Sequence, residues 1–234
     1  MGRPNGYYLA DGTKIPGTTT ITGRFKDSGG LIHWAFTQGM AQGELKAAGK
    51  PFVENTRAIA QEAADKGTVV HGLVEQYIKT GQQPAAIVDS QVKSAFDAFL
   101  RWQQGSRLEV KHTEVALVCP VLKVGGTIDA IGMLGDKWCL PDWKSSNGLY
   151  VDYLWQIANY GYLAEHGFLC DEQGRQTNKA LGIKVESYEL CRFSKENADF
   201  SHNSFASLAN EFETFKILRR AYDLARESQK RLGK

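Results

Sequence analysis

A turn signal in the middle of the chain separates two apolar runs, and it constrains the fold more than any other feature. The turn is Leu134-Gly135-Asp136-Lys137, flanked by residues 128–133 and 138–140. Short apolar runs on either side of such a turn are typical of a β-hairpin or meander. The hairpin would bring Asp129 alongside Asp142 despite their separation in sequence. Two carboxylates are therefore expected at one place.

The second strand of this hairpin adds an amine to the two acids. Alternate side chains of a strand share a face, so Asp142 and Lys144 project together while Trp143 points the other way, toward the core. Adjacent carboxylates repel one another unless a cation lies between them, and oxygen ligands suit a hard ion such as Mg²⁺ or Mn²⁺. The lysine could then orient or activate water. The pattern indicates metal-dependent hydrolysis of a phosphodiester.

Each of these residues also has an ordinary structural interpretation. Asp129 could cap a turn, and Asp142 with Lys144 could be a surface ion pair that contributes little to stability. However, Asp129 lies within a strand-like segment, where an unpaired buried charge is costly. Pro141 cannot donate a ladder hydrogen bond, so we expect the strand to be distorted where it presents Asp142. Both observations favour a site.

Composition is that of an ordinary globular protein. The 234 residues suffice for one domain with a sizeable core, and 42% are apolar and 23% charged. The net charge of +2 does not by itself indicate nucleic-acid binding, so attraction to phosphate would come from local patches and a bound metal. No apolar run of about 18 residues occurs, and residues 1–6 lack the apolar core of a signal peptide. We expect a cytoplasmic protein with no membrane partner.

Four cysteines are spread along the chain without a C-x-x-C pair that would suggest zinc. Each lies in or beside an apolar run, which predicts buried free thiols in a reducing compartment. A cluster site with one early cysteine and three cysteines close together near the C-terminus is also missing here. We expect no iron–sulfur cluster. The four cysteines are Cys119, Cys139, Cys170 and Cys191.

Hydrophobic periodicity predicts an α/β chain with helices packed on a mixed sheet. Residues 7–15, turning at Asp11-Gly12, are expected to form a hairpin, and polar residues 171–179 a loop. The expected helices are 31–48, 54–79, 87–104, 151–166 and 204–232. The expected strands are 108–119, 126–134, 138–145 and 183–193.

Two further motifs flank the acids. Residues 66–75 match the pattern G-T-x-x-H-x-x-x-E, and residues 153–160 match Y-x-x-Q-x-x-x-Y. With the two acidic segments, four elements occur in order over residues 66–160. A bare D-x-K triplet is common by chance, but this ordered set is specific. The chain resembles the PD-(D/E)xK nuclease superfamily, in particular its RecB-like exonuclease branch.

The N-terminal segment extends the resemblance. Residues 8–21 and 31–35 are similar to the G-x-x-x-P-S-V-T-T-I and L-x-x-W-A opening of phage exonucleases and of the mitochondrial genome maintenance exonuclease. Gly17-Thr18 stands where the family has Ser-Val. The resemblance implies a restriction-endonuclease-like core with a helical N-terminal portion. We expect a single nuclease domain over residues 1–234, with a hairpin and helices in 1–105 and the catalytic sheet with its flanking helices in 106–234.

The resemblance also implies roles for individual residues. In the family, the metal is held by the residues that match His71, Asp129 and Asp142 and by the main-chain carbonyl that matches Trp143. The lysine that matches Lys144 positions or deprotonates the attacking water. Products would carry 5′-phosphate and 3′-hydroxyl ends.

Several other polar residues are candidates for supporting roles. Glu114 could assist a metal through water or pair with Lys144. Glu75 could fix His71 or could be an ordinary solvated helix residue. Gln156, Tyr160 and Tyr153 would share one helical face beside the site, with the glutamine the hardest to explain as packing.

Contacts with a substrate are expected near the N-terminus. Thr18, Thr19 and Thr20 supply hydroxyls that could hold a phosphate, and Trp34 offers a flat face for base stacking or could belong to the core. The basic residues of the C-terminal helix are best explained as its solvated face, with DNA tracking as the alternative.

Together, these features predict a metal-dependent DNA exonuclease in phage or bacterial recombination, repair or DNA degradation. Its substrate would be DNA with a free end, and a recombination or single-strand-binding protein could be its partner. An endonuclease of the same fold and a non-catalytic DNA-binding module are the alternatives.

Overall fold

The computed structural model describes residues 4–27 and 29–233, without the side chain of Leu31. The predictions for residues 1–3 and for the leucine of the L-x-x-W-A motif therefore lie outside the described residues and side chains. The helices are α1 Thr18–Arg24, α2 Gly29–Ala47, α3 Thr56–Thr80, α4 Ser90–Ser106, α5 Val151–His166 and α6 Ala209–Arg231. The strands are β1 Tyr7–Tyr8, β2 Lys14–Ile15, β3 Glu109–Cys119, β4 Val124–Leu134, β5 Lys137–Lys144, β6 Phe168–Cys170, β7 Gln176–Ala180, β8 Ser187–Phe193 and β9 Phe200–Phe205.

A seven-stranded mixed sheet forms the centre of the molecule. Its strand order is β7-β6-β3-β4-β5-β8-β9. The β5 and β8 strands run parallel, and the other neighbouring pairs are antiparallel. The predicted α/β class, with a central mixed sheet flanked by helices, is confirmed. The predicted hairpin over residues 7–15 is also confirmed, as the small β1–β2 sheet.

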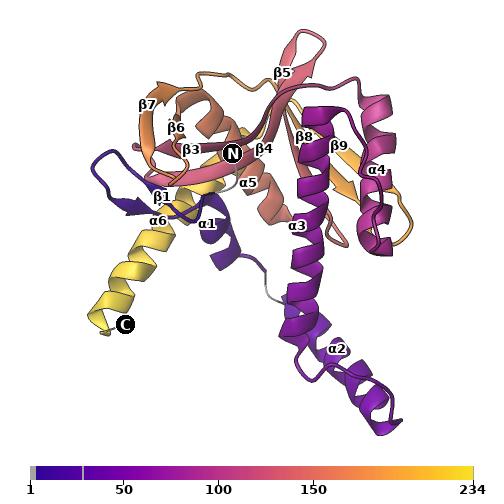
Figure 1. The fold of residues 1–234 in the computed structure, drawn as a ribbon. Helices are drawn as coiled ribbons and strands as arrows, with labels where there is room; N and C mark the ends of the chain where they lie inside the picture. The colour runs from indigo at the N-terminus through magenta and orange to yellow at the C-terminus, as the bar shows by residue number, and fades with distance from the viewer. Residues whose placement is uncertain (1–3, 28, 234) are drawn as a thin grey trace.

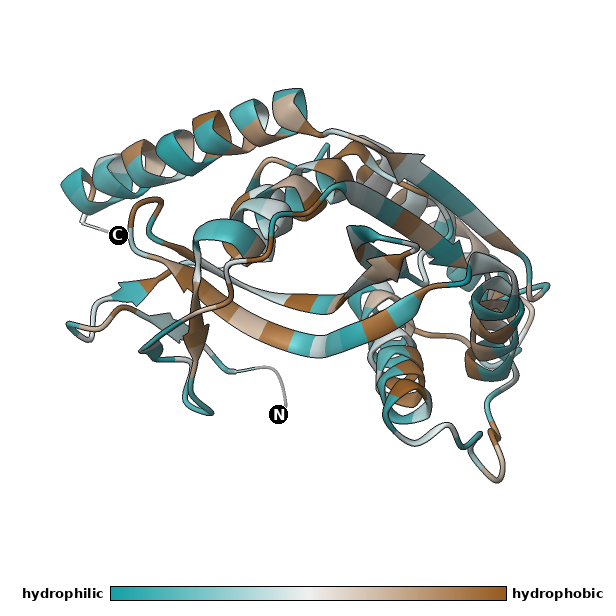
Figure 2. Ribbon diagram, turned by 90° about the horizontal axis from the view of Figure 1, so that it is seen from above, coloured by the Kyte–Doolittle hydropathy of each residue, from teal (hydrophilic) through white to brown (hydrophobic). Residues whose placement is uncertain are grey.

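Helices cover both faces of the sheet (Figures 1 and 2). On one face, α3 and α4 bury an apolar cluster that includes Phe99 and Trp143. On the other face, α1, α5 and α6 bury a cluster that includes Leu163 and Phe215. The burial of apolar surface on both sides explains why the central strand β4 is buried from Val124 to Gly132.

Local capping chemistry sets the ends of the two long helices on the α3–α4 face. The side chain of Asn55 accepts a hydrogen bond from the Arg57 N–H, which caps the start of α3. The α3 helix ends at Thr80, and the capping residue Gly81 has a φ of 69°, the left-handed conformation common after helix ends. Asp89 caps α4 through the N–H groups of Gln91 and Val92.

The α2 helix projects away from the sheet, together with the first part of α3 (Figure 1). The side chains of Ile32, Phe36 and Met40 on α2 are 66%, 67% and 56% exposed. Trp34, a predicted substrate contact, is partly buried on this same projecting helix. It therefore lies on an element apart from the residues that gather on the sheet.

Two predicted segments were wrong. The helix expected over 204–232 begins at Ala209, because residues 200–205 form β9 and pair with β8. The loop expected over 171–179 contains β7, which pairs with β6. Both strands lie at the edges of the sheet and are largely polar. Ladder hydrogen bonds to a neighbouring strand stabilise them. Backbone hydrogen bonds require no alternation of apolar and polar residues, so the sequence carries no pattern that predicts these strands.

All four cysteines are buried free thiols, as predicted. Burial raises the pKa of Cys139 and of Cys170 to about 12. The thiolate form that reacts with oxidants and binds metals is therefore scarce at neutral pH.

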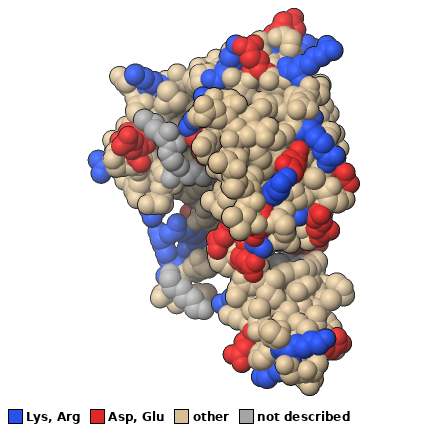
Figure 3. Space-filling model, turned by 45° about the vertical axis from the view of Figure 1, so that its right-hand side comes forward, with Lys and Arg blue, Asp and Glu red and all other residues tan. Residues whose placement is uncertain are grey.

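Charged side chains are mixed on the molecular surface. On the face shown in Figure 3, lysines and arginines are interspersed with aspartates and glutamates. This agrees with the near-neutral total charge of +2. Among the described residues, none of the helices has both the length and the apolar character needed to span a bilayer.

Gly126 on β4 allows α1 and α5 to approach the sheet closely. A Cβ atom at this position would lie 2.6 Å from Cε1 of Tyr160 and 2.8 Å from Oγ1 of Thr18. Neither distance is compatible with van der Waals contact. Glycine is therefore required here for packing.

We expect Gly126→Ala to destabilise the protein by about 1–3 kcal/mol, because overpacking displaces buried neighbours. Urea unfolding followed by circular dichroism measures the change. Gly43→Ala in the interior of α2 is the matched control, because a Cβ atom added there would meet open space, with no packing neighbour within 4 Å. The control should be neutral or stabilising by up to about 1 kcal/mol. Equal stabilities of the two variants would contradict the packing role of Gly126.

Candidate active site

The hairpin of β4 and β5 opens where its two aspartates lie. Antiparallel pairing runs from Leu134 and Lys137 to Gly132 and Cys139, and the same register would place Asp129 opposite Asp142. Beyond Cys139, β5 continues its pairing with β8 on its other side. The main-chain N–H of Trp143 donates instead to Oδ2 of Asp129, at 3.1 Å. A carboxylate thus replaces a backbone acceptor in the gap between the strands.

The proline beside Asp142 fits this local opening. Pro141 has no N–H and cannot complete an antiparallel ladder. Pro141 still aligns with Glu189 of β8 in the parallel pairing on the other side. The predicted distortion of the strand at this point therefore takes the form of a separation from β4.

Asp142, Lys144 and Gln156 form one polar cluster inside the gap. Nζ of Lys144 lies 2.7 Å from Oδ2 of Asp142 and donates to Oε1 of Gln156 at 3.2 Å. Nε2 of Gln156 lies 3.3 Å from Oδ1 of Asp142, to which it donates. The glutamine amide, presented by α5, therefore contacts both the acid and the amine of β5. The three side chains hold one another in place.

Burial makes this cluster electrostatically unusual. Asp142 is 0% exposed. Burial raises the pKa of Asp142, and the charge of Asp129 adds to this, although Lys144 opposes it. For Lys144, burial favours the neutral amine, but attraction to Asp142 and Asp129 outweighs it and raises the pKa. The site therefore attracts additional positive charge.

A second group of ligand atoms lies around Asp129. One ligand atom each from His71, Glu114 and Asp129 lies within 4.8 Å of the other two. Nδ1 of His71 is 3.6 Å from Oδ2 of Asp129. These side chains come from α3, β3 and β4, so the group depends on the tertiary fold. Val70 and Val74, buried in the α3–α4 core, fix the part of α3 that carries the histidine.

Glu114 reaches this group through an unusual backbone conformation. Its φ is 50°, the left-handed region, although it lies within β3. The residues on either side, Thr113 and Val115, keep antiparallel pairing with β4. A non-glycine residue in this region costs of order 1–3 kcal/mol, and such residues cluster at functional sites. The strain is consistent with a carboxylate that is directed into the site.

The side chains present fit a divalent cation. Imidazole nitrogen and carboxylate oxygen are ligands that Mn²⁺ accepts, and carboxylates also suit Mg²⁺. Within the described part of the chain, the buried atom His71 Nδ1 has no hydrogen-bond partner. Buried polar atoms normally have one, and a coordinated ion would satisfy this nitrogen.

Two tyrosines of α5 surround the cluster. The hydroxyl of Tyr160 accepts a hydrogen bond from Nε2 of Gln156, at 3.1 Å. The ring of Tyr153 lies 4.8 Å from Nζ of Lys144, within cation–π distance. The predicted face of Tyr153, Gln156 and Tyr160 therefore does lie beside the acids.

Other predicted residues take different places. Thr18 is 1% exposed, donates to the Gly125 carbonyl oxygen and accepts from Asn159. Its hydroxyl is therefore not open to a substrate, in contrast to the prediction. Thr19 and Thr20 are exposed and line a cavity.

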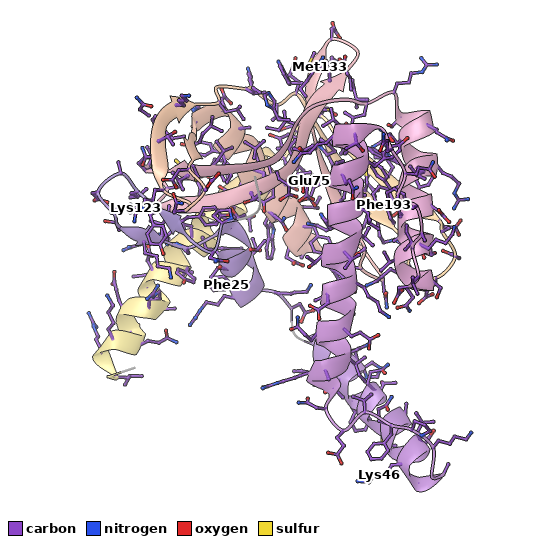
Figure 4. All side chains as sticks on the ribbon, viewed as in Figure 1. Phe25, Lys46, Glu75, Lys123, Met133 and Phe193 are labelled. Atoms are coloured by element: carbon purple, nitrogen blue, oxygen red, sulfur yellow. The ribbon has the colours of Figure 1, made fainter. Side chains whose placement is uncertain are left out.

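Trp143 and Glu75 have contacts that clarify their roles. The ring of Trp143 packs edge-on against Phe99, with centroids 5.7 Å apart, and anchors β5 in the core. The role of its carbonyl stays a prediction. Glu75, labelled on α3 in Figure 4, forms an ion pair with Lys79 one turn further along the helix. This contact favours the ordinary surface interpretation of Glu75.

Thr127 and Tyr7 adjoin the site without having been predicted. Thr127 is 5% exposed and lies two residues before Asp129, so the two share a strand face. Its Oγ1 lies 2.9 Å from the hydroxyl of Tyr7. Strand alternation could have indicated Thr127. The contact with Tyr7 bridges 120 positions in sequence and had no local signal.

No protein-family model matches the chain, and no curated protein matches it. Solved structures of low similarity do match. They include LHK-Exo in complex with dAMP, at 16% identity and a TM-score of 0.37, over 71% of this chain and 84% of that one. A second is the alkaline exonuclease LHK-Exo from Laribacter hongkongensis, at 14% identity and a TM-score of 0.31, over 70% and 85%.

SSO0001 is a third similar structure, at 14% identity and a TM-score of 0.34. The match covers 56% of this chain and 56% of the SSO0001 chain. Such identities are too low to transfer an activity.

We expect Mn²⁺ to raise the melting temperature of the protein, because an ion that binds only the folded state stabilises that state. The stabilisation is about 2.7 kcal/mol when the free ion concentration is 100 times Kd. His71→Ala and Glu114→Ala should reduce this rise, since each removes a candidate ligand. Differential scanning calorimetry with and without Mn²⁺ measures it. Glu109→Ala is the control, because this exposed glutamate of β3 pairs only with Lys111 among described residues. A rise that survives both site substitutions would exclude the proposed ligands.

Proposed function

We propose that the protein is a metal-dependent deoxyribonuclease that hydrolyses phosphodiester bonds. One observation carries the proposal: His71, Glu114 and Asp129 converge beside the buried cluster of Asp142 and Lys144, at the opening of one hairpin. A set of acids and an imidazole beside a lysine suits phosphodiester hydrolysis. The ordered sequence motifs support the same conclusion.

The chemistry follows from the donor set. A divalent cation held by His71, Glu114 and Asp129, with Asp142 as a further ligand, would polarise the phosphoryl group and lower the pKa of an attacking water. Lys144 presents an ammonium group within 2.7 Å of Asp142. That group can orient the water by hydrogen bonding and can stabilise negative charge that develops on the phosphate.

Gln156 acts as a positioning residue in this proposal. It holds Asp142 through its amide nitrogen and Lys144 through its amide oxygen. Tyr160 accepts from the same amide nitrogen and so fixes the orientation of the glutamine.

The finer assignment is a DNA exonuclease that leaves 5′-phosphate and 3′-hydroxyl ends. The resemblance of residues 66–75 and 153–160 to the RecB-like branch supports it. The corresponding biological proposal is a single nuclease domain that acts on DNA ends in phage or bacterial DNA recombination, repair or degradation.

We expect purified protein with Mn²⁺ to degrade end-labelled linear DNA. Asp142→Ala and Lys144→Ala should each lower kcat by about 10²-fold or more, because each removes a charged group at the reacting phosphate. Asp97→Ala and Lys93→Ala are matched controls, because these residues form an exposed ion pair on α4. If wild type and the site variants degrade DNA at the same rate, the nuclease proposal is wrong.

The same assay separates the alternatives. An exonuclease leaves covalently closed circular DNA intact, since a closed circle offers no end. Cleavage of closed circles would assign the protein as an endonuclease. Metal-independent DNA binding without cleavage would indicate a non-catalytic module.

We expect Gln156→Leu to lower kcat by about 10–100-fold with little change in KM, because loss of a supporting contact misplaces Lys144 and Asp142 without removing them. Tyr160→Phe should have a smaller effect, since it removes one acceptor from the glutamine. Steady-state kinetics on labelled DNA separates kcat from KM. A change confined to KM would instead place Gln156 in substrate binding.

A further inference from the structure

Two cavities lie between the β1–β2 hairpin and α6. Their volumes are about 580 Å³ and about 310 Å³. The two share lining residues, namely Lys14, Ile15, Pro16 and Arg226. They are therefore adjacent, and we call the two together the hairpin–α6 groove.

The larger cavity borders two residues that adjoin the candidate active site. Thr127 and Tyr160 belong to its lining. Thr127 shares a strand face with Asp129, and Tyr160 accepts a hydrogen bond from Gln156. One end of the groove therefore adjoins the residues proposed to act on the phosphodiester.

The larger cavity has the chemistry of a phosphate-binding surface. The exposed hydroxyl-bearing residues Thr19 and Thr20 line it, together with the cations Lys14 and Arg226. No aspartate or glutamate is among its lining residues in the described part of the chain. Hydroxyls and cations without acids suit a polyanion, even though the neighbouring site contains several carboxylates.

The smaller cavity continues the positive charge away from the site. It adds Lys123 and Lys230, and Figure 4 shows Lys123 on the same side of the molecule as the hairpin. Its two acids are Asp223 and Glu227, and Asp223 is engaged by an ion pair with Arg219. Among the described residues, the exposed cations of the groove form no salt bridge of their own. These cations are Lys14, Lys123, Arg226 and Lys230.

We propose that the hairpin–α6 groove binds a single DNA strand through its phosphates and connects that strand to the active site. The inference rests on the nuclease function proposed above and adds the path of the substrate. A cavity of about 580 Å³ has the size of a site for a drug-sized ligand, which corresponds to roughly one or two nucleotides of a single strand.

The α6 helix provides a matched test of this path. Arg226 faces the groove, whereas Arg220 and Arg231 are exposed on the same helix and line neither cavity. Lys14→Ala/Arg226→Ala and Arg220→Ala/Arg231→Ala each remove two positive charges. A purely long-range effect of charge would therefore lower the DNA affinity of both double variants by the same amount.

Fluorescence anisotropy of a labelled oligothymidine, with Ca²⁺ in place of Mn²⁺ to prevent cleavage, measures binding across a series of salt concentrations. We expect the groove variant to bind more weakly and to lower the slope of log K against log salt by about 1.4, about 0.7 for each lost phosphate contact. The control variant should bind as wild type does. Equal weakening of both variants, or of neither, would overturn the proposal. A duplex that loses as much affinity as the single strand would overturn its single-strand part.

Cleavage by wild type separates this proposal from the nuclease assignment. If wild type with Mn²⁺ leaves DNA intact but the groove variant alone loses binding, the nuclease proposal fails and the groove is supported. If wild type cleaves DNA and the groove variant binds and cleaves as wild type does, the groove proposal fails alone. Thermal melting confirms that the variants are folded, as expected for exposed positions.

Discussion

The hydrogen bond from the Trp143 N–H to Asp129 is the contact on which the site depends. An ordinary hairpin would satisfy that N–H with a carbonyl of β4 and would close the space between the strands. Here an acidic side chain accepts the bond, and the strands separate around it. The ring of Trp143 is buried against α4 on the opposite face, so the peptide cannot turn away. The separation is therefore a fixed part of the fold.

Buried charge in the gap gives the site its chemical character. A buried ion pair seldom adds net stability, because the desolvation of both groups opposes their attraction. Removal of one partner is much more costly, since it leaves an isolated buried charge. Asp142 and Lys144 therefore depend on each other and on the amide of Gln156. An arrangement that contributes so little to folding is more readily explained by function.

The sequence predicted the parts of the fold that local patterns encode. The hairpin around Gly135 and the helix of Gln156 were placed correctly because apolar periodicity and turn residues mark them. Edge strands β7 and β9 were missed, because their stability comes from pairing with neighbours. The buried position of Thr18 was missed for a similar reason. Its hydrogen-bond partner Asn159 is 141 positions away in sequence, and only the packing of α1 on α5 brings them together.

The left-handed conformation of Glu114 also bears on how a cation would bind. An acidic side chain on a relaxed strand would have to reorganise around an arriving ion, and binding would then be weaker by the free energy of that reorganisation. In this protein the backbone is already distorted, and the surrounding sheet maintains the distortion. The free energy of the strained backbone at Glu114 is therefore expended during folding and not when an ion binds. Affinity for a cation would be gained at the expense of the stability of β3.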